Sequence, residues 1–66
     1  MDLTISVGKL MILLMDTDQR AAYAFVRDNR DEISVCYYLT KDIVRIEFNN
    51  GKHSEILIKT DLKGVN

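Results

Sequence analysis

Residues 33–58 run ISVCYYLTKDIVRIEFNNGKHSEILI, and this stretch decides the fold. Apolar and polar side chains alternate within it over three segments, residues 33–39, 43–48 and 54–58. This period of two, rich in β-branched and aromatic residues, is typical of strands that bury one face. Asn49-Asn50-Gly51 fits a three-residue hairpin loop with the glycine in the left-handed conformation. We therefore expect a three-stranded antiparallel meander over residues 33–59.

The register of the meander follows from its two turns, with Lys41-Asp42 taken as a two-residue turn. The rows on one face are then Leu39–Val44–Ile56, Tyr37–Ile46–Ser54 and Val35–Phe48–Lys52. The rows on the other face are Tyr38–Arg45–Glu55, Cys36–Glu47–His53 and Thr40–Ile43–Leu57. One face is mostly apolar and the other mostly polar, and a slip of one residue would mix them, so the pattern favours this register.

Residues 16–30 favour a helix. Asp16 suits the N-cap, three alanines favour helical backbone, and Asn29 suits a left-handed end. The alternative makes residues 23–27 a strand, which would give an all-β small barrel.

Residues 1–15 are apolar and allow two interpretations. Leu3, Ile5 and Val7 alternate with polar residues, and Gly8-Lys9 suits a tight turn, which predicts a hairpin. The Leu and Met content instead suits a helix. We expect the hairpin. The predicted fold is thus α+β, a single domain over residues 1–66 with the order ββαβββ or ααβββ. Its first half covers the apolar face of the sheet, and residues 60–66 form a tail.

Composition excludes several classes of protein. The 66 residues carry 9 basic and 10 acidic side chains, one Cys and one His. That balance lacks the basic footprint of most nucleic-acid binders, and one thiol with one imidazole gives little for a metal site. We expect no cofactor and no metal. The longest apolar run is far shorter than a membrane span, and Asp2 is unlike the basic start of a signal peptide, so we expect a cytoplasmic protein.

The polar face of the meander holds the candidate site residues. Cys36, Glu47 and His53 share a row and suggest a nucleophile, a base and an orienting group. A flat sheet face, however, lacks the pocket and oxyanion donors that acyl transfer needs, so we predict no catalytic residue. The predicted partner-binding residues on this face are Tyr38, Arg45, Glu47, His53 and Glu55.

A second candidate surface lies in the apolar N-terminal segment. In the hairpin interpretation Met11, Leu13 and Met15 make both faces of one strand apolar. A chain this short can hardly cover both faces, which predicts self-association through these residues. In the alternative interpretation they belong to a buried helix that is apolar nearly all round.

These observations predict a non-enzymatic protein-binding module. We expect it to act as a small inhibitor or regulator that occupies the surface of another protein and forms a homodimer. From its size class we expect a viral or mobile-element protein, and from its Met1 start we expect a complete small gene product. The alternative function is nucleic-acid binding by a small barrel.

Overall fold

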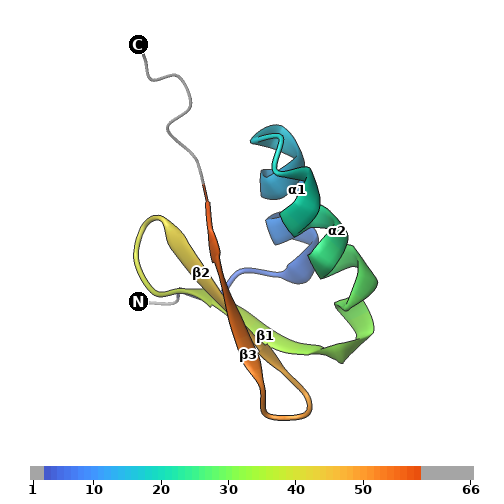
Figure 1. The fold of residues 1–66 in the computed structure, drawn as a ribbon. Helices are drawn as coiled ribbons and strands as arrows, with labels where there is room; N and C mark the ends of the chain where they lie inside the picture. The colour runs from blue at the N-terminus through green and yellow to red at the C-terminus, as the bar shows by residue number, and fades with distance from the viewer. Residues whose placement is uncertain (1–2, 59–66) are drawn as a thin grey trace.

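The computed structural model describes residues 3–58, where two helices precede a three-stranded antiparallel sheet (Figure 1). The elements are α1 (Val7–Asp16), α2 (Arg20–Asp28), a 3₁₀ turn (Arg30–Glu32), β1 (Ile33–Tyr38), β2 (Ile43–Phe48) and β3 (His53–Leu57). The α+β prediction is confirmed in its ααβββ form. The N-terminal hairpin and the all-β barrel are wrong. Residue 59 and the predicted tail lie outside the described residues.

Helix α1 begins where the predicted hairpin would have turned. Ser6 has extended backbone, and its Oγ accepts a hydrogen bond from Lys9 N at 3.1 Å, which makes it the N-cap. Gly8 therefore lies in the first helical turn and not in a hairpin loop. Leu10 and Leu14, four residues apart, are fully buried on one side of the helix. Because the segment is apolar almost throughout, its sequence satisfied the period of a strand as well as that of a helix.

The strand-like pattern before α1 is real but short. Ile5 N donates to Cys36 O and Tyr38 N donates to Leu3 O, both at 3.0 Å, and Thr4 bridges Tyr37 in antiparallel fashion. This extended segment thus lies along β1.

The connection between the helices uses three residues, and α2 begins later than predicted. Asp16 is the last residue of α1 rather than the N-cap of α2, whose N-cap is Gln19. Asp18 takes a φ of 56° between them, a conformation that aspartate tolerates better than most residues. Asn29 ends α2 as predicted, but with a φ of −108° and not in the left-handed region.

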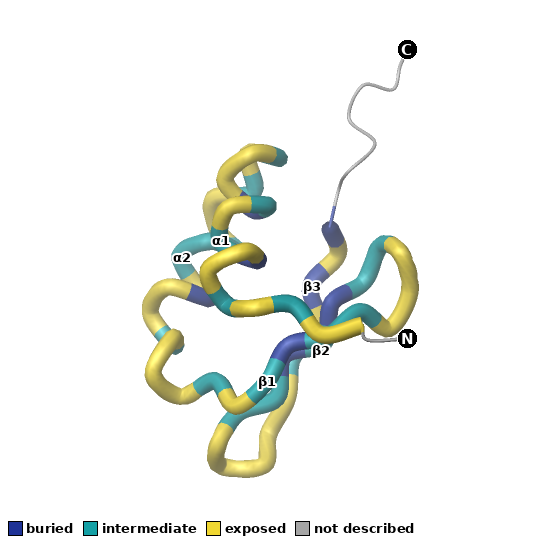
Figure 2. The backbone as a smooth tube through the Cα atoms, turned by 180° about the vertical axis from the view of Figure 1, so that it is seen from behind, coloured by how far each residue is buried: buried dark blue, intermediate teal, exposed yellow. Residues whose placement is uncertain are grey.

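Both helices lie on the same side of the sheet, and the core lies between the two layers. Figure 2 shows the buried positions concentrated there, with exposed backbone at the outer turns. The buried core residues are Leu10, Leu14, Val26, Cys36, Val44, Ile46, Ile56 and Ile58. At one end of this core the rings of Phe25 and Phe48 meet edge to face, with centroids 6.0 Å apart. The opposite face of the sheet has no helix over it in the described part of the chain.

The register between β2 and β3 is as predicted. The pairs are Ile43–Leu57, Val44–Ile56, Arg45–Glu55, Ile46–Ser54 and Glu47–His53. Gly51 has a φ of 89° in the connecting loop, and Phe48 N donates to Lys52 O at 2.8 Å across its base. The three-residue loop with a left-handed glycine is therefore confirmed.

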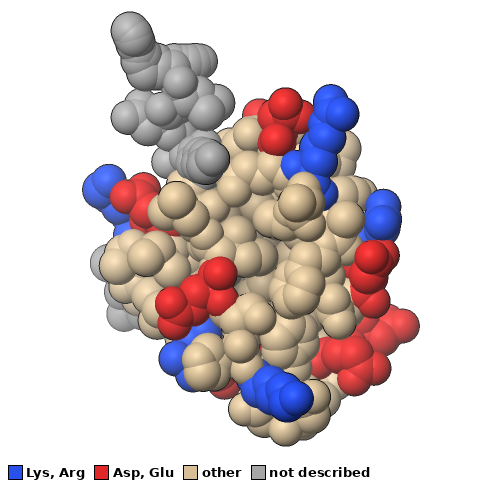
Figure 3. Space-filling view, viewed as in Figure 1, with Lys and Arg blue, Asp and Glu red and all other residues tan. Residues whose placement is uncertain are grey.

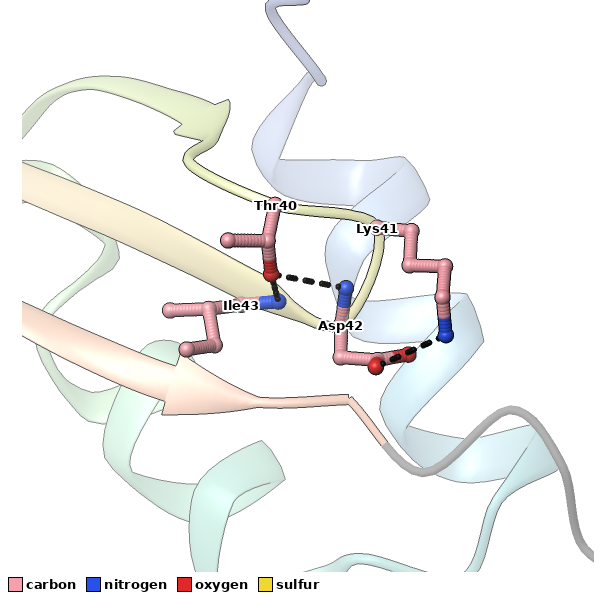
Figure 4. Close-up of polar contacts among 4 residues, drawn as sticks. All are labelled: Thr40, Lys41, Asp42 and Ile43. Atoms are coloured by element: carbon pink, nitrogen blue, oxygen red, sulfur yellow. Dashed lines mark hydrogen bonds and ion pairs between the residues drawn. The ribbon is translucent and has the colours of Figure 1, made fainter.

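The register between β1 and β2 differs from the prediction by one residue. Leu39 N donates to Ile43 O, so three residues and not two form the loop. Thr40 Oγ1 accepts hydrogen bonds from the backbone N of Asp42 and of Ile43, each at 3.1 Å, and Lys41 pairs with Asp42 at 3.0 Å (Figure 4). Because side chains alternate along a strand, this extra loop residue exchanges the two faces of β1.

The exchange of faces does not extend to the start of β1. Tyr37 pairs with Arg45 and Cys36 with Ile46, but the register shifts between Ile33 and Val35. This irregularity is a β-bulge, in which one strand holds an extra residue. It allows Ile33 to pack against the core together with Cys36, although the two are three positions apart.

Candidate functional site

The sheet face turned away from the helices is the candidate site, and we refer to it as the open face. It carries the rows Ile43–Leu57, Tyr37–Arg45–Glu55 and Val35–Glu47–His53. None of these side chains is fully buried, and those on β3 are exposed. The open face thus combines an apolar row, an aromatic ring and both signs of charge.

A hydrogen-bonded cluster lies at the centre of the open face. Tyr37 Oη donates to Glu47 Oε2 at 2.6 Å, and Arg45 Nε lies 3.3 Å from the same oxygen. The Arg45 contact is an ion pair by distance only, because its Nε–H is not aligned for a hydrogen bond. The Glu47 carboxylate, as acceptor of the Tyr37 hydroxyl, raises the pKa of Tyr37 above 10.0. Tyr37 is therefore fixed by a hydrogen bond to Glu47, and Arg45 lies beside the same carboxylate.

Four of the five predicted partner-binding residues lie on this face, and Tyr38 does not. The structure brings Arg45, Glu47, His53 and Glu55 together, but Tyr38 pairs with Val44 and packs against the core. Placing Tyr38 beside Arg45 was wrong because the loop after β1 was taken one residue too short. Tyr37 takes that position, and sequence reasoning missed it. The available signal was Thr40, whose hydroxyl favours a turn closed by its own side chain.

The predicted row of Cys36, Glu47 and His53 does not exist. Cys36 faces the helices and is 1% exposed, whereas Glu47 and His53 pair with each other on the open face. Burial raises the pKa of the Cys36 thiol above 9.0, which disfavours the thiolate. The structure therefore separates Cys36 from the other two groups of that constellation.

The row formed by Ile43 and Leu57 makes one end of the open face apolar. Leu57 is 54% exposed and Ile43 is half-buried. Leu39, 45% exposed, hydrogen-bonds to Ile43 through its backbone N–H and extends this end toward the loop. The open face therefore has an aliphatic end next to its central polar cluster.

The predicted self-association residues lie on α1. Met11 and Leu13 are half-buried and pack against the core, and Met15 is 61% exposed. Sequence reasoning missed Ile12, which is 59% exposed on the same helix. The segment predicted as a strand with two apolar faces is thus a helix whose main apolar side is buried. Its large exposed apolar side chains are Ile12 and Met15.

An open groove lies between α1 and the extended segment before it. It encloses about 650 Å³ and is lined by Thr4, Ile5, Ser6, Lys9, Ile12, Leu13 and Tyr38. Its lining offers an amino group and a phenol but no carboxylate, thiol or imidazole.

Charge is dispersed over the molecule. On the side shown in Figure 3, acidic and basic side chains lie around the periphery and uncharged atoms fill the centre. Within residues 3–58 no group of three or more His, Cys, Asp or Glu side chains is arranged to hold a metal ion. In the same range, neither helix has the length and apolar character required to cross a bilayer.

Comparison of the chain with protein-family models, with curated protein sequences and with solved structures finds no match.

Proposed function

We propose that this chain is a non-enzymatic protein-binding module that acts by covering part of a partner protein with its open face. The observation that carries the proposal is that, within residues 3–58, helices cover one side of the sheet and leave the other side open. The other side presents Tyr37 and Arg45 beside the apolar pair Ile43 and Leu57. Tyr and Arg are enriched at the energetic centres of protein interfaces.

Pre-organisation of the open face supports the proposal. Tyr37 is hydrogen-bonded to Glu47, and Arg45 lies in an ion pair with the same carboxylate. Side chains that are already ordered lose less conformational entropy when a partner binds. A regulator or inhibitor of this kind needs no reactive group, because it works by occupying the surface that another molecule would use.

The charges of the open face favour a protein partner over a nucleic acid. Arg45 lies next to Glu47 along the strand and opposite Glu55 across it. Phosphate backbones are bound by surfaces with an excess of Lys and Arg, which these carboxylates offset. The nucleic-acid alternative also depended on a small barrel, which this fold is not.

The test compares two double variants with the same composition of changes. Tyr37→Ala/Arg45→Ala alters the open face, and Tyr23→Ala/Arg27→Ala alters a tyrosine–arginine pair on α2, where the guanidinium lies 5.9 Å from the ring centroid. A protein retained from an extract of the source cells by the wild-type chain is identified, and its Kd is measured by calorimetry. We expect the open-face variant to weaken binding by at least about thirtyfold, the effect of losing one strong interface residue.

The control variant is expected to keep the wild-type Kd, and circular dichroism checks that both variants are folded. Equal binding by the wild type and the open-face variant would show that the partner uses another surface. Loss of binding in the α2 variant alone would move the interface to the helices.

A further inference from the structure

Strand β3 has one edge that β2 does not use. Phe48 N donates to Lys52 O at 2.8 Å and Ile58 N donates to Asp42 O at 2.6 Å, so the even-numbered residues around β3 bond to β2. In an antiparallel ladder the intervening residues point their N–H and C=O groups the other way. Those residues are His53, Glu55 and Leu57. Their backbone N–H and C=O groups point away from β2, toward the outer edge of the sheet.

One backbone group on this edge is already taken. The side-chain amide of Gln19, in the loop between the helices, donates to Leu57 O at 2.7 Å. This contact confirms that the odd-numbered carbonyls point outward. Within residues 3–58 nothing pairs with the outward groups of His53 and Glu55, whose side chains are exposed. The unused part of the edge is therefore confined to these two residues.

The edge lacks two of the usual devices that prevent strand pairing, proline and bulges. Proteins protect edge strands with proline, bulges or inward charges. The chain contains no proline, and the β2–β3 ladder runs without a register shift. His53 and Glu55, two positions apart, both offer unpaired backbone N–H and C=O groups. Such an edge suits a short antiparallel strand whose own unpaired groups are also two positions apart.

Three registers place Glu55 opposite an outward-facing residue of β3 in a second copy, and one of the three avoids the costs of the others. Pairing Glu55 with Glu55 of the second copy would place like charges opposite each other, which is destabilising. Pairing Glu55 with Leu57 of the second copy would compete with the Gln19 hydrogen bond. Pairing His53 with Glu55 of the second copy avoids both costs, uses the unpaired groups of both copies, and places an imidazole N–H donor beside a carboxylate twice.

We propose that two copies of the chain pair through antiparallel β3 strands, with His53 of each copy opposite Glu55 of the other. A two-fold axis passes between the two Ser54 residues, and the product is a continuous six-stranded sheet. Both helical layers lie on one side of this sheet. The two open faces lie side by side on the other, so the dimer presents a doubled binding surface. The pairing uses the edge and is independent of the open-face proposal.

The first test is the mass of the particle. Sedimentation equilibrium of the full chain at increasing concentration is expected to approach about 15 kDa, twice the chain mass of 7.6 kDa. The Tyr37→Ala/Arg45→Ala variant is expected to give the same masses, because it leaves the β3 edge intact. A particle that remains at 7.6 kDa up to millimolar concentration would overturn the proposal without bearing on partner binding by the open face.

The second test fixes the register through engineered thiols. In the proposed dimer the two Ser54 residues face each other as a non-hydrogen-bonded pair, with Cα atoms about 4.5 Å apart, within disulfide reach. The two Glu55 residues are displaced by two positions along the strands, which takes their Cα atoms beyond about 7 Å. Under mild oxidation Ser54→Cys is therefore expected to give about tenfold more linked dimer than Glu55→Cys.

The native thiol serves as the background, because Cys36 is buried. More cross-linking through position 55 than through position 54 would rule out the proposed register. Equal, wild-type levels of cross-linking for both variants would rule out pairing through β3.

Discussion

At the scale of single residues, Gly8 and Gly51 stand in opposite backbone environments. A Cβ atom added at either position would have no neighbour within 4 Å, so space does not distinguish them. Gly51 has a φ of 89°, which side chains disfavour, whereas Gly8 lies in the first turn of a helix. The difference between the two positions is therefore one of conformation alone.

Alanine is expected to act in opposite directions at these two glycines. Gly51→Ala should lower the free energy of unfolding by about 1 kcal/mol through strain in the loop. Gly8→Ala should raise it by about 0.5 kcal/mol, because alanine restricts the unfolded chain and favours helix. Urea denaturation followed by circular dichroism measures both changes. A stabilising Gly51→Ala would contradict the loop conformation that sets the β2–β3 register.

Single residues also explain why the candidate site was predicted only in part. Arg45, Glu47, His53 and Glu55 belong to β2 and β3, whose connection contains a glycine that marks a left-handed position in the sequence itself. The loop before β2 depends on a threonine hydroxyl, which forms a common and less distinctive turn. The loop was predicted one residue too short, so Tyr38 was placed on the open face where the structure has Tyr37.

At the scale of elements, β2 is the central strand of the sheet and carries an isoleucine on each of its two faces. Ile46 is fully buried under the helices, and Ile43 is half-buried on the open face. The two positions hold the same side chain on the same central strand, so they compare the two faces directly.

Removing one methylene from each isoleucine is expected to lower the free energy of unfolding by different amounts on the two faces. Ile46→Val should cost about 1 kcal/mol of unfolding free energy, as deletions in well-packed cores do. Ile43→Val should cost less than about 0.5 kcal/mol, the usual range for surface changes. The shift in the midpoint of urea denaturation at constant slope gives both values. A larger cost at Ile43 would mean that the open face is covered in solution.

The elements also show which parts of the fold a sequence can specify. The meander was predicted because alternation persists through three segments, although the separation of apolar from polar residues gave the correct register only between β2 and β3. The choice between hairpin and helix over residues 3–15 was wrong because Leu10 to Met15 is apolar without interruption, so neither period stands out. The helix forms because Ser6 caps it and Leu10 and Leu14 meet the core, and the second condition belongs to tertiary packing.

At the scale of the whole molecule, Cys36 reports on the contact between the helical layer and the sheet. Its side chain is 1% exposed within the core shared by both layers. Burial holds the pKa of its thiol above the ordinary value of 9.0. Both effects disfavour formation and reaction of the thiolate while the two layers are packed together.

Alkylation of Cys36 by iodoacetamide is accordingly expected to be slow in the native protein. At pH 8 the rate should be at least about tenfold below that of free cysteine, since both the raised pKa and the burial oppose attack. In urea the rate should rise to the free value over the same range in which circular dichroism shows loss of helix. Native-state alkylation as fast as that of free cysteine would show that the layers open independently of global unfolding.

The order of the elements along the chain has a kinetic consequence. Helix α1 packs against α2, β1 against β2 and β2 against β3, so most neighbours in space are also neighbours in sequence. Such a topology closes mainly short loops, and proteins of low contact order fold within milliseconds or faster. The bond between Gln19 and Leu57 spans 38 residues and joins the helical half to the last strand. We expect this hydrogen bond to form last, when the helix pair docks on the three-stranded sheet after each has folded.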